Sequence, residues 1–492
     1  MSIKQSLQRL FKHSAIYGLG HIINRSIGFL LLPLYTNFFN KEDFGVAGVI
    51  MTWQVIFTLI YVYGLDAGFL RFYIAASDAA EKKKIFSTTF ASIVATSLLV
   101  SLALWIAIPS LPRWLLRGHV PVGIDLLLLL RLLIAILLFD TLAFIPMLAL
   151  RAEEKSVVYV ILKVSNVGIN LAANFYFIFH LQKGVSGIFW ANLASSLITW
   201  IMTIPLLMRY GGLSFSSPLL KKLFLFGLPA LPSGLAIALM DSVDRIFLER
   251  FASLSSVGLY NSGSKLGMSM ALLVAAFRFA WPPFFLSVAG QADAKAIYSR
   301  VLTYVIALCS FVFLLISLYI DPISRIAIGS YHLIGAEYWP ANRIVPVIML
   351  AYICYAAYLI FYVGVYVNDK PVYLIWATLV GVLVNLLANW LLIPPLDILG
   401  AAWARFLGYL VMAVSLYFFS QRLYPIAFEW QRIAKLAAAT TIVFVLNQIP
   451  WLQPFWWRGI LLLLSFPLLL AGMHFFLDEE VRKIRRPFRQ NH

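Results

Sequence analysis

Long apolar segments dominate the chain and limit what it can fold into. Bounded by charged residues, glycines and prolines, about fourteen of them approach the roughly 20 residues that a helix needs to cross a bilayer. They lack the strict alternation of transmembrane strands. With 62% hydrophobic and only 12% charged residues, the 492-residue chain is predicted to be an all-α polytopic membrane protein. The predicted spans lie approximately at 14–39, 45–76, 85–108, 125–150, 156–180, 184–208, 223–250, 257–286, 301–320, 344–366, 371–393, 398–419, 433–449 and 458–477.

The charges outside these spans are unevenly distributed. Both tails and the even-numbered connections hold most of the Lys and Arg residues, including Lys82, Lys83 and Lys84. Because positive residues are retained on the cytoplasmic side, both termini are predicted to be cytoplasmic. The formal net charge of +17 then reflects topology and contact with anionic lipid rather than binding of nucleic acid. Cys309 and Cys354 lie within apolar runs and predict neither a disulfide nor a metal site.

The two halves of the chain share an internal repeat. Three matches occur in the same order: Phe44–Val46 with Val257–Leu259, Asn170–Phe175 with Asn385–Trp390, and Gly187–Asn192 with Gly400–Arg405. They predict a duplication of six spans in which both copies enter the bilayer from the same side, an arrangement typical of transporters. The predicted domains are an N-lobe at 1–212, a C-lobe at 213–425, and 426–492 with two extra helices and a basic cytoplasmic tail.

Two segments and the repeated motifs carry a resemblance to a known family. The segments are Asn24–Val46 (NRSIGFLLLPLYTNFFNKEDFGV) and Asp244–Leu266 (DRIFLERFASLSSVGLYNSGSKL), and the motifs are NxxxN followed by GxxWA. The chain resembles Wzx-type polysaccharide flippases of the multidrug/oligosaccharidyl-lipid/polysaccharide (MOP) exporter superfamily. Related lipid II flippases often carry Arg-Asp after the first-span glycine, whereas Gly28 precedes Phe29, which weakens the case for a peptidoglycan precursor.

The resemblance implies both a fold and a task. The implied fold is a MATE-like V of two six-helix lobes, with a cavity lined mainly by spans one, two, seven and eight, plus two C-terminal helices. The implied task is the movement of undecaprenyl-diphosphate-linked oligosaccharide, an O-antigen unit of lipopolysaccharide or another surface polysaccharide, to the outer leaflet of the bacterial inner membrane by alternating access. A downstream polysaccharide polymerase is a candidate partner, besides the membrane lipids.

Charged residues within the spans point to an anionic substrate. Basic residues outnumber acidic ones, and each charge at the bilayer centre costs at least about 2.5 kcal/mol. A diphosphate suits such a site, because arginine binds its oxygens bidentately and lysine adds a point charge. The basic residues are Arg25, Arg71, Arg131, Lys163, Arg245, Lys265, Arg278 and Arg405, and the acidic ones are Asp66, Asp140, Asp241 and Asp244.

Depth in the membrane separates these candidates. Arg25, beside Asn24, lies near the midplane, where substrate binding is favoured over an ion pair with Asp66. For Lys265 and Arg278, substrate binding and a structural role are equally favoured. Arg71 lies near the cytoplasmic end of its span, where its side chain can extend to the membrane interface. Arg131, Lys163 and Arg405 are expected near interfaces.

The acids have two possible uses. Asp66, Asp140 and Asp241 are candidates for H⁺ or Na⁺ coupling, but pairing with buried arginines is the more common use of such acids. Asp244 and Arg245 are assigned to structural pairing. No cofactor and no metal are predicted.

Asparagines recur on one face of two predicted helices. They suit either sugar hydroxyls or hydrogen bonds between helices, and helix packing is the favoured interpretation. The residues are Asn166, Asn170 and Asn174 in the first copy, and Asn385 and Asn389 in the second. Pro229 and Pro232 are expected to bend span seven.

Two other functions compete with transport of a lipid-linked glycan. A membrane-embedded polymerase or ligase of the same pathway needs a reactive extracytoplasmic loop. The longest connection, Asp321–Arg343, offers Asp321, Arg325, His332, Glu337 and Arg343 without an acid/base pair, so a solvated loop is favoured. A MATE-like drug exporter predicts surplus acid inside the membrane, which the surplus of cations opposes.

Overall fold

The computed structural model describes residues 27–117, 120–212, 214–228, 231–449 and 457–477. Helices dominate these ranges, and the two strands there, β1 (Ala327–Ile328) and β2 (Tyr331–His332), form a short antiparallel hairpin. Ten of the described helices are long and apolar enough to cross a membrane. The helices are α2 (Leu32–Phe38), α3 (Lys41–Val62), α4 (Leu65–Ala75), α5 (Ala79–Ala107), α6 (Leu111–Leu115), α7 (Leu126–Ala152), α8 (Ser156–Asn174), η1 (Phe175–His180), α9 (Ser186–Tyr210), α10 (Ser217–Gly227), α11 (Leu231–Ser242), α12 (Asp244–Phe251), α13 (Leu254–Val288), α14 (Ala294–Ser324), η3 (Ala336–Ile344), α15 (Val345–Val367), α16 (Val372–Leu396), α17 (Ile398–Leu423), α18 (Trp430–Asn447) and α19 (Arg458–Gly472).

The predicted class, an all-α polytopic membrane protein, is confirmed. The ten candidate spans coincide with the predicted second to sixth and eighth to twelfth spans. Span seven is divided among α10, α11 and α12, and spans thirteen and fourteen form the shorter helices α18 and α19. The first half of span one, up to residue 26, lies outside the described residues.

Span two contains a break that the sequence analysis did not predict. Tyr63 and Gly64 both adopt the left-handed conformation, with φ of 36° and 76°, and they separate α3 from α4. A Cβ atom on Gly64 would lie 2.6 Å from the carbonyl oxygen of Gly227 at the end of α10. The break therefore occurs where α10 approaches the N-lobe, and only glycine fits there. Span seven is expected to bend near Pro229. In the structure α10 ends at Gly227 and α11 begins at Leu231, and Pro229 itself lies outside the described residues.

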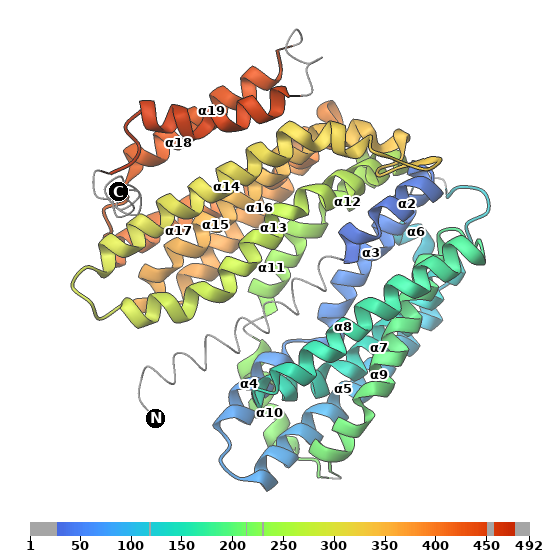
Figure 1. Ribbon diagram of the computed structural model, residues 1–492. Helices are drawn as coiled ribbons and strands as arrows, with labels where there is room; N and C mark the ends of the chain where they lie inside the picture. The colour runs from blue at the N-terminus through green and yellow to red at the C-terminus, as the bar shows by residue number, and fades with distance from the viewer. Residues whose placement is uncertain (1–26, 118–119, 213, 229–230, 450–456, 478–492) are drawn as a thin grey trace, which may run out of the picture.

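The helices form two groups that diverge from one end of the molecule (Figure 1). In the first group α7 packs against α5 and α9, and α8 packs against α9; in the second, α17 packs against α15 and α16. Helix α3 connects the groups because it contacts both α7 and α13. Helices α18 and α19 pack against α14, on the flank of the second group that faces away from the first group. The exact domain boundaries stay a prediction.

Helices α3 and α13 begin in the same way, at positions that the sequence repeat pairs. The side chain of Asn40 accepts a hydrogen bond from the Asp43 amide at the start of α3, and Ser253 accepts one from the Ser256 amide at the start of α13. Such N-caps satisfy amides that the first helical turn leaves unpaired. The two copies thus start their second helix with equivalent caps.

The same two helices touch through a pair of equivalent glycines. A Cβ atom on Gly45 would lie 2.0 Å from the Leu254 carbonyl oxygen, and one on Gly258 would lie 2.0 Å from the Lys41 carbonyl oxygen. Each glycine of the repeat therefore contacts the helix start of the other copy. This reciprocal contact brings the two lobes together at the end where α3 and α13 begin.

Candidate functional site

Five charged side chains of the second lobe define what we call the central charge cluster: Asp241, Asp244, Arg245, Lys265 and Arg405. They come from α11, α12, α13 and α17. Since α3 packs along α13, the cluster lies beside the contact between the lobes. Three cations and two acids make up the cluster, so its formal charge is positive.

Asp244 is the fully buried acid of the cluster. Arg405 donates to its carboxylate from Nε at 2.9 Å and from Nη2 at 2.6 Å, and Tyr260 adds its hydroxyl at 2.6 Å. Asn389 donates to the second carboxylate oxygen at 3.0 Å. Both Arg405 nitrogens and the Tyr260 hydroxyl donate to the same carboxylate oxygen, and charge-assisted bonds of this kind hold the pair in one geometry. Asp244, assigned with Arg245 to structural pairing, thus forms its salt bridge with Arg405.

Arg405, for which the sequence predicts a place near a membrane interface, is buried inside the second lobe. It is only 2% exposed, because α17 packs closely on α15 and α16 and carries the side chain into the lobe. Its Nη2 also donates to the Asp241 carbonyl oxygen at 2.9 Å. A buried guanidinium needs such partners, and the fold supplies them from α11 and α12.

Arg245 points from α12 toward α13. Its Nε donates to the side-chain oxygen of Asn261 at 2.8 Å, and its Nη1 donates to the Asp241 carbonyl oxygen at 3.1 Å. Within the described ranges no carboxylate forms a salt bridge with it. Asp241 instead accepts from the Tyr409 hydroxyl at 2.8 Å. Arg245 is therefore held in place by neutral groups, and no carboxylate of the described residues compensates its charge by direct contact.

Lys265 lies one helical turn beyond Asn261 on the same face of α13. Its Nζ is 4.8 Å from the centre of the Tyr35 ring and 4.9 Å from that of Phe44, both in the first lobe. Its side chain also passes within 3.6 Å of where a Cβ on Gly28 would be. Among the described residues it has neither a hydrogen bond nor a salt bridge. Aromatic faces attract a cation without neutralising it.

The asparagines that recur in the two copies lie at contacts between helices. Asn166 donates to Thr199 at 2.8 Å, Asn170 to Asn192 at 2.8 Å, and the Tyr35 hydroxyl to Asn174 at 2.9 Å. In the second lobe Asn389 bonds to Asp244, while both side-chain polar atoms of Asn385 are buried without a partner in the described part of the chain. Asparagines thus sit at helix contacts in both lobes.

The remaining basic candidates lie apart from the cluster or outside the described residues. Arg278 is exposed on α13, and Arg71 is exposed at the end of span two, 6.0 Å from the Phe226 ring centre. Arg131 is exposed beside Trp105. Arg25 and Asn24 lie outside the described residues, so their assignment to the substrate stays a prediction.

The two acids of the first lobe remain candidates for ion coupling. Asp66 is half-buried in the first turn of α4 and has no hydrogen bond or salt bridge within the ranges that the structure covers. Asp140 is exposed on α7, beside Ser196 and Lys163. No group of His, Cys, Asp and Glu that could hold a metal ion occurs among the described residues.

Several partners of the charged residues escaped the sequence analysis. Tyr35, Tyr260, Asn261 and Tyr409 all hydrogen-bond or stack at the cluster, yet single tyrosines and asparagines in apolar helices give no distinctive pattern. One signal was available: the repeat aligns Asn192 with Arg405, so a polar side chain occupies both positions. In the first copy this side chain is the neutral Asn192, which bonds to an asparagine. In the second copy it is the charged Arg405, which forms a salt bridge with Asp244.

The sequence model of the family described as "Polysaccharide biosynthesis protein" matches residues 10–289, more than half of the chain. No protein with a curated description matches the sequence. Solved structures similar to the chain include "Lipid II flippase MurJ, inward closed conformation", at a TM-score of 0.73 and 14% identity, covering 92% of this chain and 98% of that one.

MATE transporters are also similar. An inward-facing multidrug resistance MATE family transporter of the MOP superfamily gives a TM-score of 0.61 at 16% identity, covering 85% of this chain and 96% of that one. A mutant of the Vibrio cholerae MATE transporter VcmN gives 0.57 at 16% identity, covering 85% and 97%. At such low identities these similarities establish the fold: two six-helix lobes in a V.

Proposed function

Since the chain belongs to the polysaccharide biosynthesis protein family, we propose that it is a flippase for a lipid-linked oligosaccharide. The substrate would be an undecaprenyl-diphosphate-linked oligosaccharide, an O-antigen unit or another repeat unit of surface polysaccharide. It would move from the cytoplasmic to the outer leaflet of the bacterial inner membrane. The fold shared with a protein titled a lipid II flippase supports this proposal.

One observation carries the proposal: Lys265 stands between the lobes, and among the described residues no carboxylate forms a salt bridge with it. An uncompensated charge within the bilayer costs at least about 2.5 kcal/mol, so its retention calls for an anion that visits the site. Arg245 of α12 is bonded to Asn261, one turn from Lys265 on α13, and within the described ranges its guanidinium donates to neutral oxygens. A diphosphate would satisfy both groups, the lysine as a point charge and the arginine through its planar fork.

The lobe contacts suit entry of substrate from the cytoplasm. With both termini cytoplasmic, the ends of α3 and α13 that meet through Gly45 and Gly258 lie on the outer side. The hairpin and η3 strengthen that side, because the Asn37 amide donates to the His332 carbonyl of β2 at 2.7 Å and Tyr338 of η3 donates to the Asn40 carbonyl at 2.8 Å. The lobes diverge toward the opposite side (Figure 1). Rocking of the lobes would then open the outer side and release the lipid-linked glycan.

The energy source and downstream steps extend the same proposal. Asp66 and Asp140 are the acids at which H⁺ or Na⁺ would bind if an ion gradient drives the cycle, since neither forms a salt bridge in the described part of the chain. Asp241 and Asp244 are engaged by Tyr409 and Arg405. A polymerase that joins the delivered units is the expected partner outside.

The test compares Lys265→Ala, Lys265→Arg and Arg131→Ala in proteoliposomes that contain a lipid-linked oligosaccharide. The rate at which the glycan becomes accessible to an external lectin measures flipping. We expect Lys265→Ala to slow flipping by about tenfold or more, because a charge-assisted contact to phosphate is lost, and Lys265→Arg to retain most of the rate. Arg131→Ala, which removes an exposed cation outside the cluster, should flip normally. A wild-type rate in Lys265→Ala contradicts the assigned role.

A further inference from the structure

A second polar cavity lies at the end of the second lobe where the hairpin is, away from the central charge cluster. It has a volume of about 1070 Å³ and is lined by the end of α14, by η3, and by α18 and α19. In the proposed orientation all of these segments meet at the outer surface. Two of its walls come from α18 and α19, which lie outside the two repeats. The cavity is thus a separate feature of the C-terminal helices.

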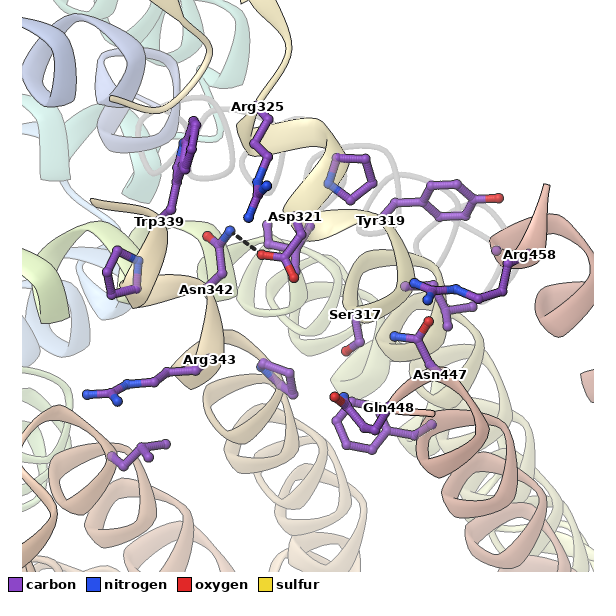
Figure 2. Close-up of a pocket in the computed structure, with 18 residues that line it drawn as sticks. Ser317, Tyr319, Asp321, Arg325, Trp339, Asn342, Arg343, Asn447, Gln448 and Arg458 are labelled. Carbon is purple, nitrogen blue, oxygen red and sulfur yellow. Dashed lines mark hydrogen bonds between the residues drawn. The ribbon is translucent and has the colours of Figure 1, made fainter. Parts of the chain in front are cut away.

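Three arginines and one acid give this cavity a positive character: Arg325, Arg343, Arg458 and Asp321. The carboxylate of Asp321 accepts a hydrogen bond from the Asn342 amide at 2.7 Å. Arg325 stacks 4.7 Å from the centre of the Trp339 ring, and in Figure 2 its guanidinium points toward Asp321 and Asn342. The loop that the sequence analysis assigned to solvent therefore forms part of a cavity with a net positive charge.

The other side of the cavity carries buried polar atoms that have no partner among the described residues. Nη1 of Arg458, the side-chain oxygen of Asn447 and the hydroxyl of Ser317 are buried and have no hydrogen bond within the described residues. Figure 2 shows Arg458 extending from α19 toward Asn447 on α18. Buried polar groups are normally satisfied, because each unmade bond costs about 1–3 kcal/mol. A ligand that offers both acceptors and donors would satisfy this set.

The lining also fits a hydroxyl-rich group. Trp339 and Tyr319 present aromatic rings, and Gln448 adds an amide beside Asn447. Amides bind hydroxyl groups through paired donors and acceptors, and guanidinium groups bind phosphate bidentately. Both kinds of group occur together in this one cavity.

We propose that this cavity binds a phosphate ester joined to a hydroxyl-rich group at the outer membrane surface. Arg458 and Arg325 hold the phosphate oxygens, and Asn447, Gln448 and Trp339 contact the hydroxyl-bearing part. Two sources share this chemistry: the phosphorylated sugar of a lipid-linked glycan and the glycerol-phosphate headgroup of phosphatidylglycerol. The site does not depend on Lys265, so it stands independently of the proposed transport function.

The cavity is also joined to the contact between the lobes. His332 lies edge-on to Trp339 at 5.3 Å between ring centres, and its backbone is bonded to Asn37 of the first lobe. Tyr338, the neighbour of Trp339 in η3, bonds to the carbonyls of Phe39 and Asn40. A ligand in the cavity thus contacts the segment that holds the outer ends of the lobes together.

The experiment measures binding to the full-length protein in detergent by native mass spectrometry and titration calorimetry. The probes are short-chain phosphatidylglycerol, a soluble oligosaccharide 1-phosphate, and the same oligosaccharide without phosphate. We expect at least one phosphorylated probe to bind, and Arg458→Gln and Arg325→Gln each to weaken it by about tenfold or more. Arg250→Gln, which removes an exposed arginine at the same end but outside the cavity, serves as the matched control and should bind normally.

The probes distinguish the source of the ligand. Binding of the sugar phosphate alone identifies the glycan as the ligand, and binding of phosphatidylglycerol alone identifies the bilayer lipid; both support the site. Equal binding of the neutral oligosaccharide, or unchanged affinity in Arg458→Gln and Arg325→Gln, overturns it. If either variant is not monodisperse, Asn447→Asp provides the second measurement, since an added negative charge should repel the phosphate. Lys265→Ala should keep full affinity here while losing flipping, so the two proposals fail separately.

Discussion

At the residue scale, Asp244 and Arg405 illustrate how a buried ion pair constrains a membrane protein. The two residues come from α12 and α17, and their carboxylate and guanidinium meet at 2.6 Å with side chains that are 0% and 3% exposed. Tyr260 and Asn389 complete the hydrogen bonds of the carboxylate. The desolvation cost of both charges is offset only while all of these partners are present. The pair and its partners therefore link α12 and α13 to α16 and α17, which are distant in sequence.

Removal of one partner should destabilise the lobe strongly. We expect Arg405→Leu to lower the free energy of unfolding by about 3–5 kcal/mol, because Asp244 would remain buried without a cation. The double variant Arg405→Leu with Asp244→Asn should lose clearly less than the sum of the two single variants. Thermal unfolding of purified protein in detergent measures both effects, with the exposed Arg300→Gln as control. Additive losses would show that the two side chains do not interact.

At the element scale, a small network joins four helices of the first lobe around the turn between α7 and α8. Glu153 and Lys155, in the turn between α7 and α8, form a salt bridge. Tyr73 of α4 donates to Glu153 at 3.0 Å, and Tyr210 of α9 donates to its other oxygen at 2.9 Å. The turn is thereby fastened to α4 and α9, which are separated widely in sequence.

This network should make stability depend on pH in the acid range. Burial alone would raise the pKa of Glu153, but hydrogen bonds from Lys155, Tyr210 and Tyr73 outweigh it and lower the pKa below its ordinary value of 4.5. A lowered pKa means that the stabilisation is fully present above pH 4.5 and is lost as the pH falls through the lowered value. We expect Glu153→Gln to cost about 1 kcal/mol at pH 7 and much less near pH 3, as measured by thermal unfolding.

The control for this prediction is Glu81→Gln, which changes an exposed glutamate in the first turn of α5. It should have a small effect that does not follow the same pH dependence. An equal loss of stability in Glu153→Gln at both pH values would contradict the role of the charge.

At the scale of the whole molecule, the two lobes meet through a contact that the repeat makes symmetric. Gly45 lies on the Leu254 carbonyl and Gly258 on the Lys41 carbonyl, with room for no side chain at either position. A methyl group there would have to push the helices apart by more than an ångström to reach ordinary van der Waals distance. Closure of this end therefore requires glycine in both copies.

Gly45→Ala and Gly258→Ala should each shift the protein away from the closed form, by on the order of 1–3 kcal/mol of overpacking. Spin labels at the exposed positions Glu42→Cys and Ala252→Cys would report the separation of the helix starts by pulsed electron resonance. We expect longer distances, and similar ones, in both variants. Gly168→Ala, at a glycine with open space around it, should leave the distances unchanged. An effect in one variant only would show that the contact is not symmetric.

The sequence by itself determined the membrane class, most of the spans and the existence of the repeat. The bilayer requires an apolar run of sufficient length wherever a helix crosses it, whatever that helix packs against, so these features are local. The family match and the shared fold confirm the resemblance to the MOP exporter superfamily. The break at Tyr63 and Gly64 was not predictable, because it depends on contact with α10.

Only the tertiary structure decided which charges are neutralised. Local sequence places Arg245, Lys265 and Arg405 alike in apolar helices, but α17 brings Arg405 to Asp244, whereas α13 leaves Lys265 between two aromatic rings. The cavity beside Arg458 likewise exists only where α18 and α19 pack against α14. Pairing of charges depends on atoms brought together from distant parts of the chain, and no pattern along the sequence encodes those distances.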